Sequence, residues 1–270
     1  MTKDKKIGFI GGGNMAEAFI KGLLDAGAKK KNITFYEPFA SRREHLEESY
    51  GVSSAAGNLD LVRDNDIVVL AIKPQIVREV LADLEGAFGR DTLLISILAG
   101  VHTHTLENLL GGAPRVVRAM PNTPALVGAG AAAVCAGEYS EAGDLDLACE
   151  LFRAVGTVVQ VSESQLDAVT GLSGSGPAFV YTFIEALAAG GVQEGLRLDV
   201  AQELAVQTVY GAAKLVKESG EHPALLREKV CSPGGTTIAA VRVLEERSLR
   251  ASLMDAVGVA TRRSKELGQA

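Results

Sequence analysis

Cysteine is scarce in this chain of 270 residues, and its scarcity argues against a fold built on disulfides. Only three cysteines are present, Cys135, Cys149 and Cys231, and an odd number at wide spacing does not make a disulfide framework. Neither they nor the four histidines have the spacing of zinc ligands, so we expect no metal site. This use of cysteine favours a reducing cytoplasm as the location.

Long apolar runs and an excess of basic residues are also absent. The first apolar run, Ile7–Ile10, is too short for a signal peptide or a membrane span, and the apolar stretch 179–192 is interrupted by Glu185. A formal net charge of −6 argues against a nucleic-acid surface. With 47% hydrophobic and 22% charged residues, the composition is that of a globular protein, and the length favours two domains.

Glycine is abundant, and the first of three glycine-rich blocks begins at Gly11. It follows the apolar strand 7–10 and precedes an apolar stripe at helical spacing, which is the context of a dinucleotide-binding turn. In that motif Gly11 allows the tight turn, Gly13 lets the backbone approach a pyrophosphate, and Ala16 lets the helix pack closely on the strand. The block therefore predicts a nucleotide site near the N-terminus.

The second predicted strand, 33–37, ends in Glu37. An acidic residue at this place hydrogen-bonds the ribose 2′-hydroxyl of NAD. Arg42 and Arg43 follow shortly, and either is suited to pair with the 2′-phosphate of NADP or to lie on a solvated helix face. This segment leaves the preference between the two cofactors open.

Further strands alternate with helices up to about residue 160. We expect them at 66–72, 92–97 and 115–119, with edge strands at 128–136 and 156–161. This alternation predicts an α/β fold with a parallel, doubly wound sheet of the Rossmann type in residues 1–162. Strand signals then vanish, which predicts an all-α domain over residues 163–270.

Two more glycine-rich blocks, 170–177 and 232–237, lie within the helical region. Glycine is unfavourable inside a helix, so we expect each block to be a loop that enters a helix and presents free N–H groups to an anion. The front of the chain would then hold a nucleotide and the back a small anionic substrate. The helix over residues 179–191 is apolar on nearly every face, which favours burial against a second copy of the chain.

Residues Gly171–Ala178 and Cys231–Ala240 resemble the two signature stretches of pyrroline-5-carboxylate reductase. Residues 71–74 and 120–124 are similar to further stretches of that family, and the order and spacing agree along nearly the whole chain. The resemblance implies reduction of 1-pyrroline-5-carboxylate to L-proline by NAD(P)H, the last step of proline biosynthesis. It also implies a homodimer that assembles further in some members, as in a decamer.

The resemblance carries the family's site residues onto this sequence. Thr170 is implied as a proton donor or as a positioning group. The implied site for the substrate carboxylate is the loop through Gly235, Thr236 and Thr237, to which the glycine-rich blocks themselves add Gly234 and Ser175. The implied cofactor residues, to which Glu37 and Arg42 are added from the strand pattern, are Ile10, Gly11, Gly12, Gly13, Asn14, Met15, Asn58, Ala71, Ile72, Lys73, Pro74, Ile97, Leu98 and Ala99.

The chain departs from the family pattern at two places. The resemblance implies NADPH as the cofactor, but Glu37 occupies a region where some members have a small or basic residue, so NADH is the alternative. An acidic residue that contacts the substrate amine in some members falls on Gly220, with Glu221 one place along. Two other interpretations remain: a dehydrogenase resembling the β-hydroxyacid enzymes, and a regulator that binds NAD(P) without catalysis.

Overall fold

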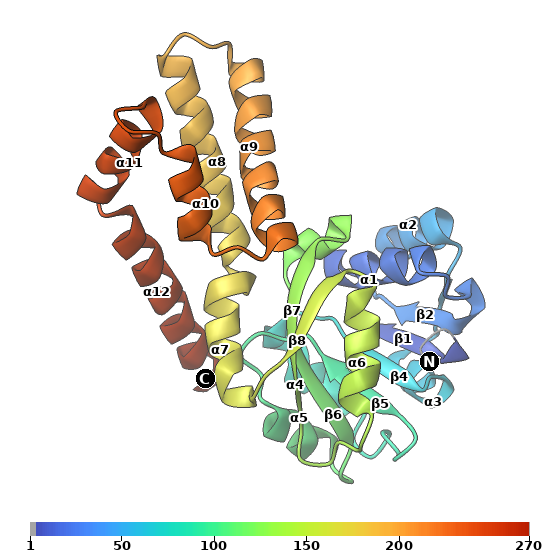
Figure 1. Ribbon diagram of the computed structural model, residues 1–270. Coiled ribbons are helices and arrows are strands. Elements are labelled where there is room, and N and C mark those ends of the chain that lie inside the picture. Colours follow the sequence, from blue (N-terminus) through green and yellow to red (C-terminus); the bar gives the residue numbers. More distant parts are fainter. Residues whose placement is uncertain (1–3, 270) are drawn as a thin grey trace. The chain divides into compact units, whose positions relative to one another are not determined.

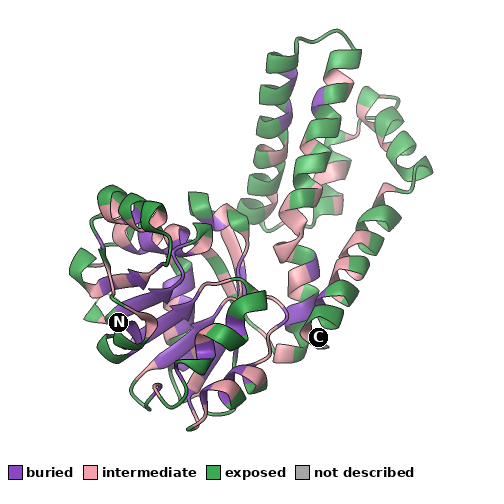
Figure 2. Cartoon of the chain, turned by 180° about the vertical axis from the view of Figure 1, so that it is seen from behind, coloured by how far each residue is buried: buried purple, intermediate pink, exposed green. Residues whose placement is uncertain are grey.

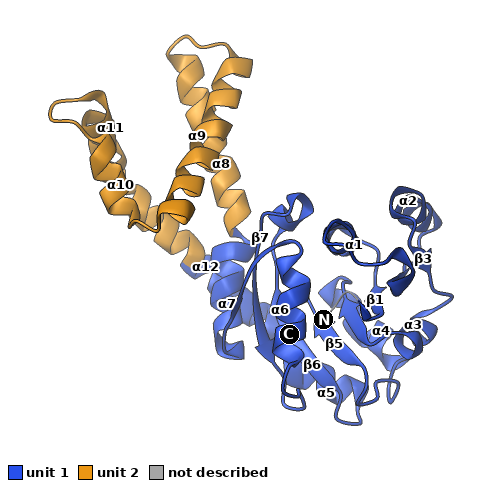
Figure 3. Cartoon of the chain, turned by 45° about the vertical axis from the view of Figure 1, so that its right-hand side comes forward, with its two compact units in different colours: residues 1–175, 258–270 blue, residues 176–257 orange. Residues whose placement is uncertain are grey.

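The structure is a computed structural model that describes residues 4–269, and it divides into two compact units. The first unit comprises the chain up to Ser175 together with the chain from Gly258 onward, and the second comprises Gly176–Val257 (Figure 3). The second unit is therefore inserted in sequence between two parts of the first.

An eight-stranded sheet forms the centre of the first unit (Figure 1). Its spatial order is β3-β2-β1-β4-β5-β6-β7-β8, and every neighbouring pair is parallel except β6 and β7. The strands are β1 (Ile7–Ile10), β2 (Ile33–Tyr36), β3 (Ser53–Ser54), β4 (Ile67–Leu70), β5 (Leu93–Ser96), β6 (Arg115–Met120), β7 (Gly130–Ala136) and β8 (Gly156–Gln160). The order of the first six strands is that of a doubly wound dinucleotide-binding fold.

Helices cover both faces of this sheet. They are α1 (Asn14–Asp25), α2 (Ala40–Tyr50), α3 (Asn58–Asp64), α4 (Val77–Ala82), α5 (Thr103–Leu110), α6 (Asp144–Arg153) and α7 (Leu166–Val169). Short 3₁₀ turns lie at Lys30–Asn32, Pro74–Ile76, Thr123–Val127 and Glu163–Gln165, and a π-helical turn lies at Thr170–Gly174.

The apolar composition of the strands explains why helices cover both faces of the sheet. In β4, Ile67 and Val69 belong to the core cluster that contains α1 and α6, whereas Val68 and Leu70 belong to the cluster that contains α4 and α5. Successive strand residues point to opposite faces, so a strand without polar positions has to be buried on both sides. The predicted fold class, an α/β domain followed by helices, is confirmed.

The second unit is entirely helical. It holds α8 (Gly176–Gln193), α9 (Leu198–Ser219), α10 (Pro223–Val230), α11 (Thr236–Glu246) and the start of α12 (Leu249–Gln269), which ends in the first unit. Its buried apolar residues are Ala188, Ala201 and Ala205, where α8 packs on α9, and most of its surface is exposed (Figure 2). No helix within residues 4–269 is long and apolar enough to cross a membrane.

Three details differ from the expectations. Strand β7 runs antiparallel to β6, because the connection 121–129, which holds only a 3₁₀ turn, is too short for a parallel crossover. It is also not an edge strand, since β8 lies outside it. The glycine block at 170–177 is not a loop: a π-helical turn at 170–174, closed by a 2.8 Å hydrogen bond from Ser175 N to Thr170 O, joins α7 to α8.

The compact units also divide the chain differently from the predicted domains 1–162 and 163–270. Leu166 packs with Ala133 and Cys135 in a small core cluster, which keeps α7 in the first unit. The end of α12 joins that unit as well, because Ser264 bonds to Asp167 there.

Candidate functional site

The first glycine block forms a tight turn between β1 and α1. Gly11 has φ +97°, and a Cβ there would lie 2.6 Å from the carbonyl oxygen of Ala71, so only glycine fits. Gly13 has an extended backbone, and a Cβ built on it would meet nothing within 4 Å. No side chain caps α1, so the N–H groups of its first turn are available to an anion.

A cavity of about 510 Å³ opens above this turn, at the carboxyl ends of β1, β2 and β4. It lies where the strand order reverses, which is the place where doubly wound sheets bind their ligands. Ten of the predicted cofactor residues line it: Ile10, Gly11, Gly13, Asn14, Glu37, Arg42, Asn58, Ala71, Ile72 and Lys73. The structure thus brings most of the predicted nucleotide site together.

Six predicted cofactor residues do not line this cavity: Gly12, Met15, Pro74, Ile97, Leu98 and Ala99. Met15 packs partly into the core below α1, and Leu98 is buried in the cluster of α4 and α5. Residues 97–99 follow β5 at the same edge of the sheet, next to β4. Leu98 therefore offers this edge its backbone rather than its side chain.

The backbone of Gly12 is bound at its N–H group by Glu37 and at its carbonyl group by Arg42. The Gly12 N–H donates to the carboxylate of Glu37 over 2.8 Å, and the Phe39 N–H donates to its other oxygen over 3.2 Å. Nε of Arg42 donates to the Gly12 carbonyl over 2.6 Å. The carboxylate that the sequence assigns to a ribose thus also fixes the turn, and the Glu37 residue is 8% exposed.

Asn58 supplies a direct test of whether the cavity suits a nucleotide. Its Oδ1 atom is buried and has no hydrogen-bond partner among the described residues. A buried acceptor without a donor is unfavourable by ~1–3 kcal/mol, so a ligand hydroxyl or amino group there would stabilise it. Together with the free space above Gly13 and the uncapped α1, this acceptor fits a dinucleotide.

Sequence reasoning missed five residues that line the cavity. They are Tyr36, Pro38, Phe39, Ile76 and Val80. Phe39 is 72% exposed. The sequence signal that could have found it is an aromatic residue two positions beyond the end of the predicted strand 33–37, next to Pro38. Ile76 and Val80 carry no such signal, because an apolar residue near a strand end usually belongs to the core.

The second glycine block places Thr170 with its hydroxyl already engaged. The hydroxyl donates to the Leu166 carbonyl over 2.9 Å, and Ser173 makes the same type of bond to Val169 over 3.1 Å. The Thr170 oxygen can still accept a hydrogen bond from a ligand. Asn122 donates to the Ser173 carbonyl over 3.0 Å, so the proline-flanked loop after β6 supports this turn.

The third block forms a turn and then begins α11. Gly235 N donates to Ser232 O over 3.0 Å, with Pro233 and Gly234 between them and Gly234 at φ +66°, a residue order typical of a type II turn. No side chain caps α11, so the N–H groups of its first turn are free to bind an anion. Neither the Thr236 nor the Thr237 hydroxyl makes a hydrogen bond within residues 4–269.

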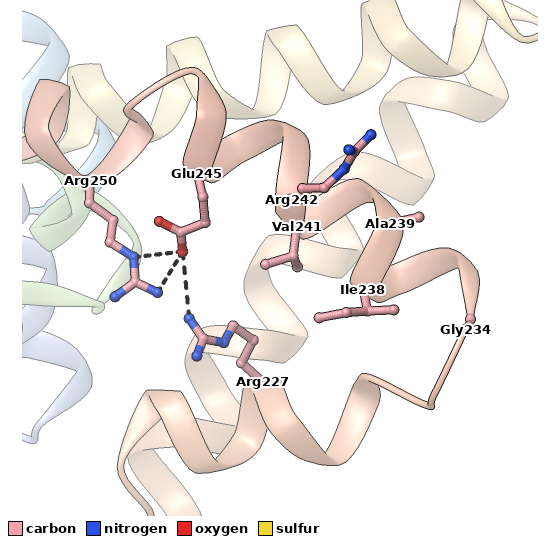
Figure 4. A pocket seen from close by; sticks show the side chains of 9 residues that line it. Arg227, Gly234, Ile238, Ala239, Val241, Arg242, Glu245 and Arg250 are labelled. Carbon is pink, nitrogen blue, oxygen red and sulfur yellow. Dashed lines mark hydrogen bonds and ion pairs between the residues drawn. The ribbon is translucent and has the colours of Figure 1, made fainter.

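Gly234 and Gly235 also line a cavity of about 660 Å³ in the second unit, which Thr236 and Thr237 do not reach (Figure 4). Its other lining residues, none predicted from the sequence, are Arg227, Ile238, Ala239, Val241, Arg242, Glu245 and Arg250. Glu245 lies between two arginines there, 2.8 Å from Arg250 and 3.8 Å from Arg227. Glu245 thus balances one of these two arginine charges, while Arg242 pairs with Glu246 at 3.5 Å.

Within the part of the chain that the structure describes, no group of three or more histidine, cysteine, aspartate or glutamate side chains is placed so that it could hold a metal ion. The three cysteines are free thiols, and burial raises the pKa of Cys135 to about 11. A cavity that suits a dinucleotide and an uncapped turn in a helical unit that suits an anion are features expected of a two-domain NAD(P)-dependent oxidoreductase.

Comparison with known proteins agrees with this class of protein and identifies the family within it. Residues 163–267 match the family described as pyrroline-5-carboxylate reductase dimerisation, and residues 6–100 match NADP oxidoreductase, coenzyme F420-dependent. The chain is 48% identical to pyrroline-5-carboxylate reductase of Synechocystis, with 98% of each chain covered. It is 46% identical to that of Methanosarcina acetivorans, with 99% of each covered.

Solved structures show the same relation. The pyrroline-5-carboxylate reductase of Coxiella burnetii superposes with a TM-score of 0.93 at 39% identity, covering 98% of this chain and 99% of that one. The Plasmodium falciparum enzyme, solved with NADP bound, superposes with a TM-score of 0.88 at 34% identity and the same coverage. The chain belongs to the pyrroline-5-carboxylate reductase family.

Proposed function

We propose that this chain reduces 1-pyrroline-5-carboxylate to L-proline with a nicotinamide cofactor, the last step of proline biosynthesis. The observation that carries the proposal is the uncapped turn at 232–237, within a chain that matches reductases of this name along nearly its whole length. The substrate bears one carboxylate, and this turn offers unpaired N–H groups with two free hydroxyls beside them. A reductase of a neutral imine would not need such a turn.

The bound cofactor supplies a hydride to the imine carbon. The residues of the chain then have to hold the carboxylate and orient the ring. In the proposal the N–H groups around Gly234 and Gly235 and at Thr236 and Thr237 hold the carboxylate, with the Thr237 hydroxyl as a further donor. Charge-assisted hydrogen bonds of this kind are about twice as strong as neutral ones.

Thr170 is proposed to position the ring rather than to donate a proton. Its own proton is directed at the Leu166 carbonyl, which leaves the oxygen as an acceptor for a protonated ring nitrogen. A free hydroxyl is also a poor acid near neutral pH. Ser175, the residue just before α8, is proposed to line the substrate site beside Thr170.

The cofactor is proposed to be NADPH, with NADH as the second candidate. The Plasmodium relative with NADP bound supports the first. Glu37 supports the second, because its buried carboxylate lines the cavity after β2, where a ribose hydroxyl is a better neighbour than a phosphate. The other implied cofactor residues, among them Met15, Pro74 and residues 97–99, are proposed to contact the bound cofactor.

A homodimer is the proposed minimum assembly, with larger oligomers such as a decamer as an extension. In the second unit only three alanines are buried among the described apolar side chains, which is too small a core for an independent domain. Exposed apolar residues on α8 include Val180, Phe183 and Leu187. The family match to a dimerisation region supports cover by a second copy. The cytoplasm is the proposed location.

The test is to measure initial rates of NADPH and NADH oxidation, in parallel, with purified protein and 1-pyrroline-5-carboxylate. We expect turnover and L-proline as the product, detected by chromatography. Binding of either cofactor without turnover of the imine would contradict the proposal and favour a regulator. Oxidation of hydroxyacids without imine reduction would favour the dehydrogenase interpretation.

A further inference from the structure

Two charged residues, Glu37 and Arg42, lie at the end of the nucleotide cavity that follows β2. Dinucleotide-binding folds place the ribose 2′ position at this end, where an acidic residue selects NAD and an arginine selects NADP. Lys73, the other charged residue of the cavity, follows β4 on the opposite side of β1. The discrimination between the cofactors therefore depends on what Glu37 and Arg42 can do.

Arg42 is engaged by protein groups on both sides. Its Nε atom donates to the Gly12 carbonyl over 2.6 Å, and its terminal NH2 group forms an ion pair with Glu17 at 2.5 Å. The Arg42 and Glu17 side chains are 25% and 18% exposed, so solvent screens the pair only in part. Arg43 is directed elsewhere, to the carbonyls of Glu37 and Pro38.

Glu17 is a residue of α1 whose carboxylate collects three donors from α2. Besides Arg42 it binds Nε2 of His45 over 2.9 Å and the hydroxyl of Tyr50 over 2.8 Å. Burial alone would raise its pKa, but the hydrogen bonds from His45, Arg42 and Tyr50 lower the pKa to about 2. The carboxylate is thus charged throughout the neutral range, and its hold on Arg42 does not vary with pH there.

We propose that Glu17 weakens the binding of NADPH relative to that of NADH by holding the Arg42 guanidinium away from the ribose 2′ position. A 2′-phosphate then meets the negative charge of Glu37 without a free arginine to balance it. A 2′-hydroxyl instead donates to the Glu37 carboxylate. Glu17 does not line the cavity, so it acts as a positioning residue through Arg42. The proposal rests on the nicotinamide cofactor proposed above.

The test measures dissociation constants of NADPH and NADH by isothermal titration calorimetry, which needs no substrate. We expect Glu17→Ala to strengthen NADPH binding relative to NADH binding, so that the dissociation constant of NADPH divided by that of NADH falls about tenfold. A tenfold change corresponds to ~1.4 kcal/mol of differential binding. Glu17→Gln keeps an acceptor for Tyr50 and His45 but removes the charge, and should shift the ratio in the same direction. If Glu17→Ala does not fold, the ratio measured for Glu17→Gln tests the proposal instead.

Two further variants separate this role from a structural one. Tyr50→Phe removes another tie between α1 and α2 but leaves Arg42 held, so the ratio should stay at the wild-type value. Adding Arg42→Ala to Glu17→Ala should abolish the shift. An equal loss of affinity for both cofactors in Glu17→Ala and Glu17→Gln, or the same shift in Tyr50→Phe, would overturn the proposal. If neither cofactor binds the wild-type protein, the proposed function fails at this cavity and the inference fails with it.

Discussion

The Ser264 hydroxyl donates a 2.6 Å hydrogen bond to the Asp167 carboxylate, and both residues are buried. They lie 97 residues apart, one on the last turns of α12 and the other on α7. This bond fixes the last turns of α12 to the helix that precedes the π-helical turn of Thr170. A buried charged acceptor needs such a donor, because its desolvation is otherwise uncompensated.

Replacing Ser264 by alanine should therefore destabilise the protein. Leaving a buried carboxylate without its donor lowers the free energy of unfolding by ~1–3 kcal/mol. Urea denaturation of the two proteins measures the difference. Ser252→Ala is the control, since Ser252 is exposed and its hydroxyl bonds to the carbonyl of Ser248, the residue just before α12, and it should change stability by less than ~0.5 kcal/mol. Equal effects of both substitutions would contradict the role of the buried bond.

The Thr237 hydroxyl is predicted to bind the substrate carboxylate. Thr237→Val should raise the Michaelis constant for 1-pyrroline-5-carboxylate about tenfold to hundredfold, as one hydrogen bond to a charged group contributes ~1.5–3 kcal/mol. Steady-state kinetics measures this, and calorimetry should give an unchanged dissociation constant for NADPH. Thr182→Val on α8 is the control, because the Thr182 hydroxyl bonds to the Ala178 carbonyl. A Michaelis constant that stays at the wild-type value would remove Thr237 from the site.

Gly13 is predicted to leave room for the pyrophosphate of the cofactor. Its φ of −69° suits any residue and a Cβ there meets nothing, so Gly13→Val should preserve the melting temperature while lowering cofactor affinity about hundredfold. Calorimetric titration and thermal unfolding test both parts. Gly11→Ala should do the reverse and destabilise the fold by ~1–3 kcal/mol, because its φ of +97° and the close Ala71 carbonyl exclude a side chain. Normal cofactor affinity in Gly13→Val would place the pyrophosphate elsewhere.

Glu17 should make the stability depend on pH in the acid range. Its folded-state pKa of about 2 lies below the ordinary value of 4.5, so its contribution is present above pH 4.5 and is lost as the pH falls through 2. The difference in unfolding free energy between wild type and Glu17→Gln should be ~1–3 kcal/mol at pH 7, allowing for partial solvent screening. Guanidinium titrations from pH 7 to pH 2 should show this difference shrinking, and a constant difference would contradict the assignment.

The apolar face of α8 is predicted to be covered by a second copy of the chain. Phe183→Asp should reduce the sedimenting mass to that of a monomer, since a buried, unpaired charge at an interface is strongly unfavourable. Tyr139→Asp is the matched control: Tyr139 is 43% exposed, close to the 39% of Phe183, and lies in the first unit. Analytical ultracentrifugation distinguishes them. If both variants keep the wild-type mass, α8 is not at the interface.

Much of the first unit could be predicted from the sequence because its signals are local. Apolar runs bounded by glycine or polar residues gave the positions of β1, β4 and β5. The two-residue β3 has no periodic pattern to detect. The antiparallel β7 had a signal that was overlooked: the segment between β6 and β7 is too short for a parallel crossover.

The candidate site was predictable to a similar extent and for the same reason. Gly11, Gly13 and Glu37 lie in a motif whose spacing is set by one strand, one turn and one helix. The ion pair of Glu17 with Arg42 was not predictable, because it depends on how α1 packs beside α2. The π-helical turn at Thr170 was not predictable either, since its glycines suggest a loop until the 2.8 Å bond from Ser175 to Thr170 is seen.

The discontinuous first unit affects how the protein is made. The segment from Gly258 onward is synthesised after the helical insertion, yet it supplies Ser264 to a unit whose sheet ends at Gln160. Domains generally fold as units while the chain emerges from the ribosome. Here the nucleotide-binding part has to wait for the whole helical insertion to be translated before its final helix turns can dock. Completion of the first unit therefore follows translation of the second, although each unit has its own set of internal contacts.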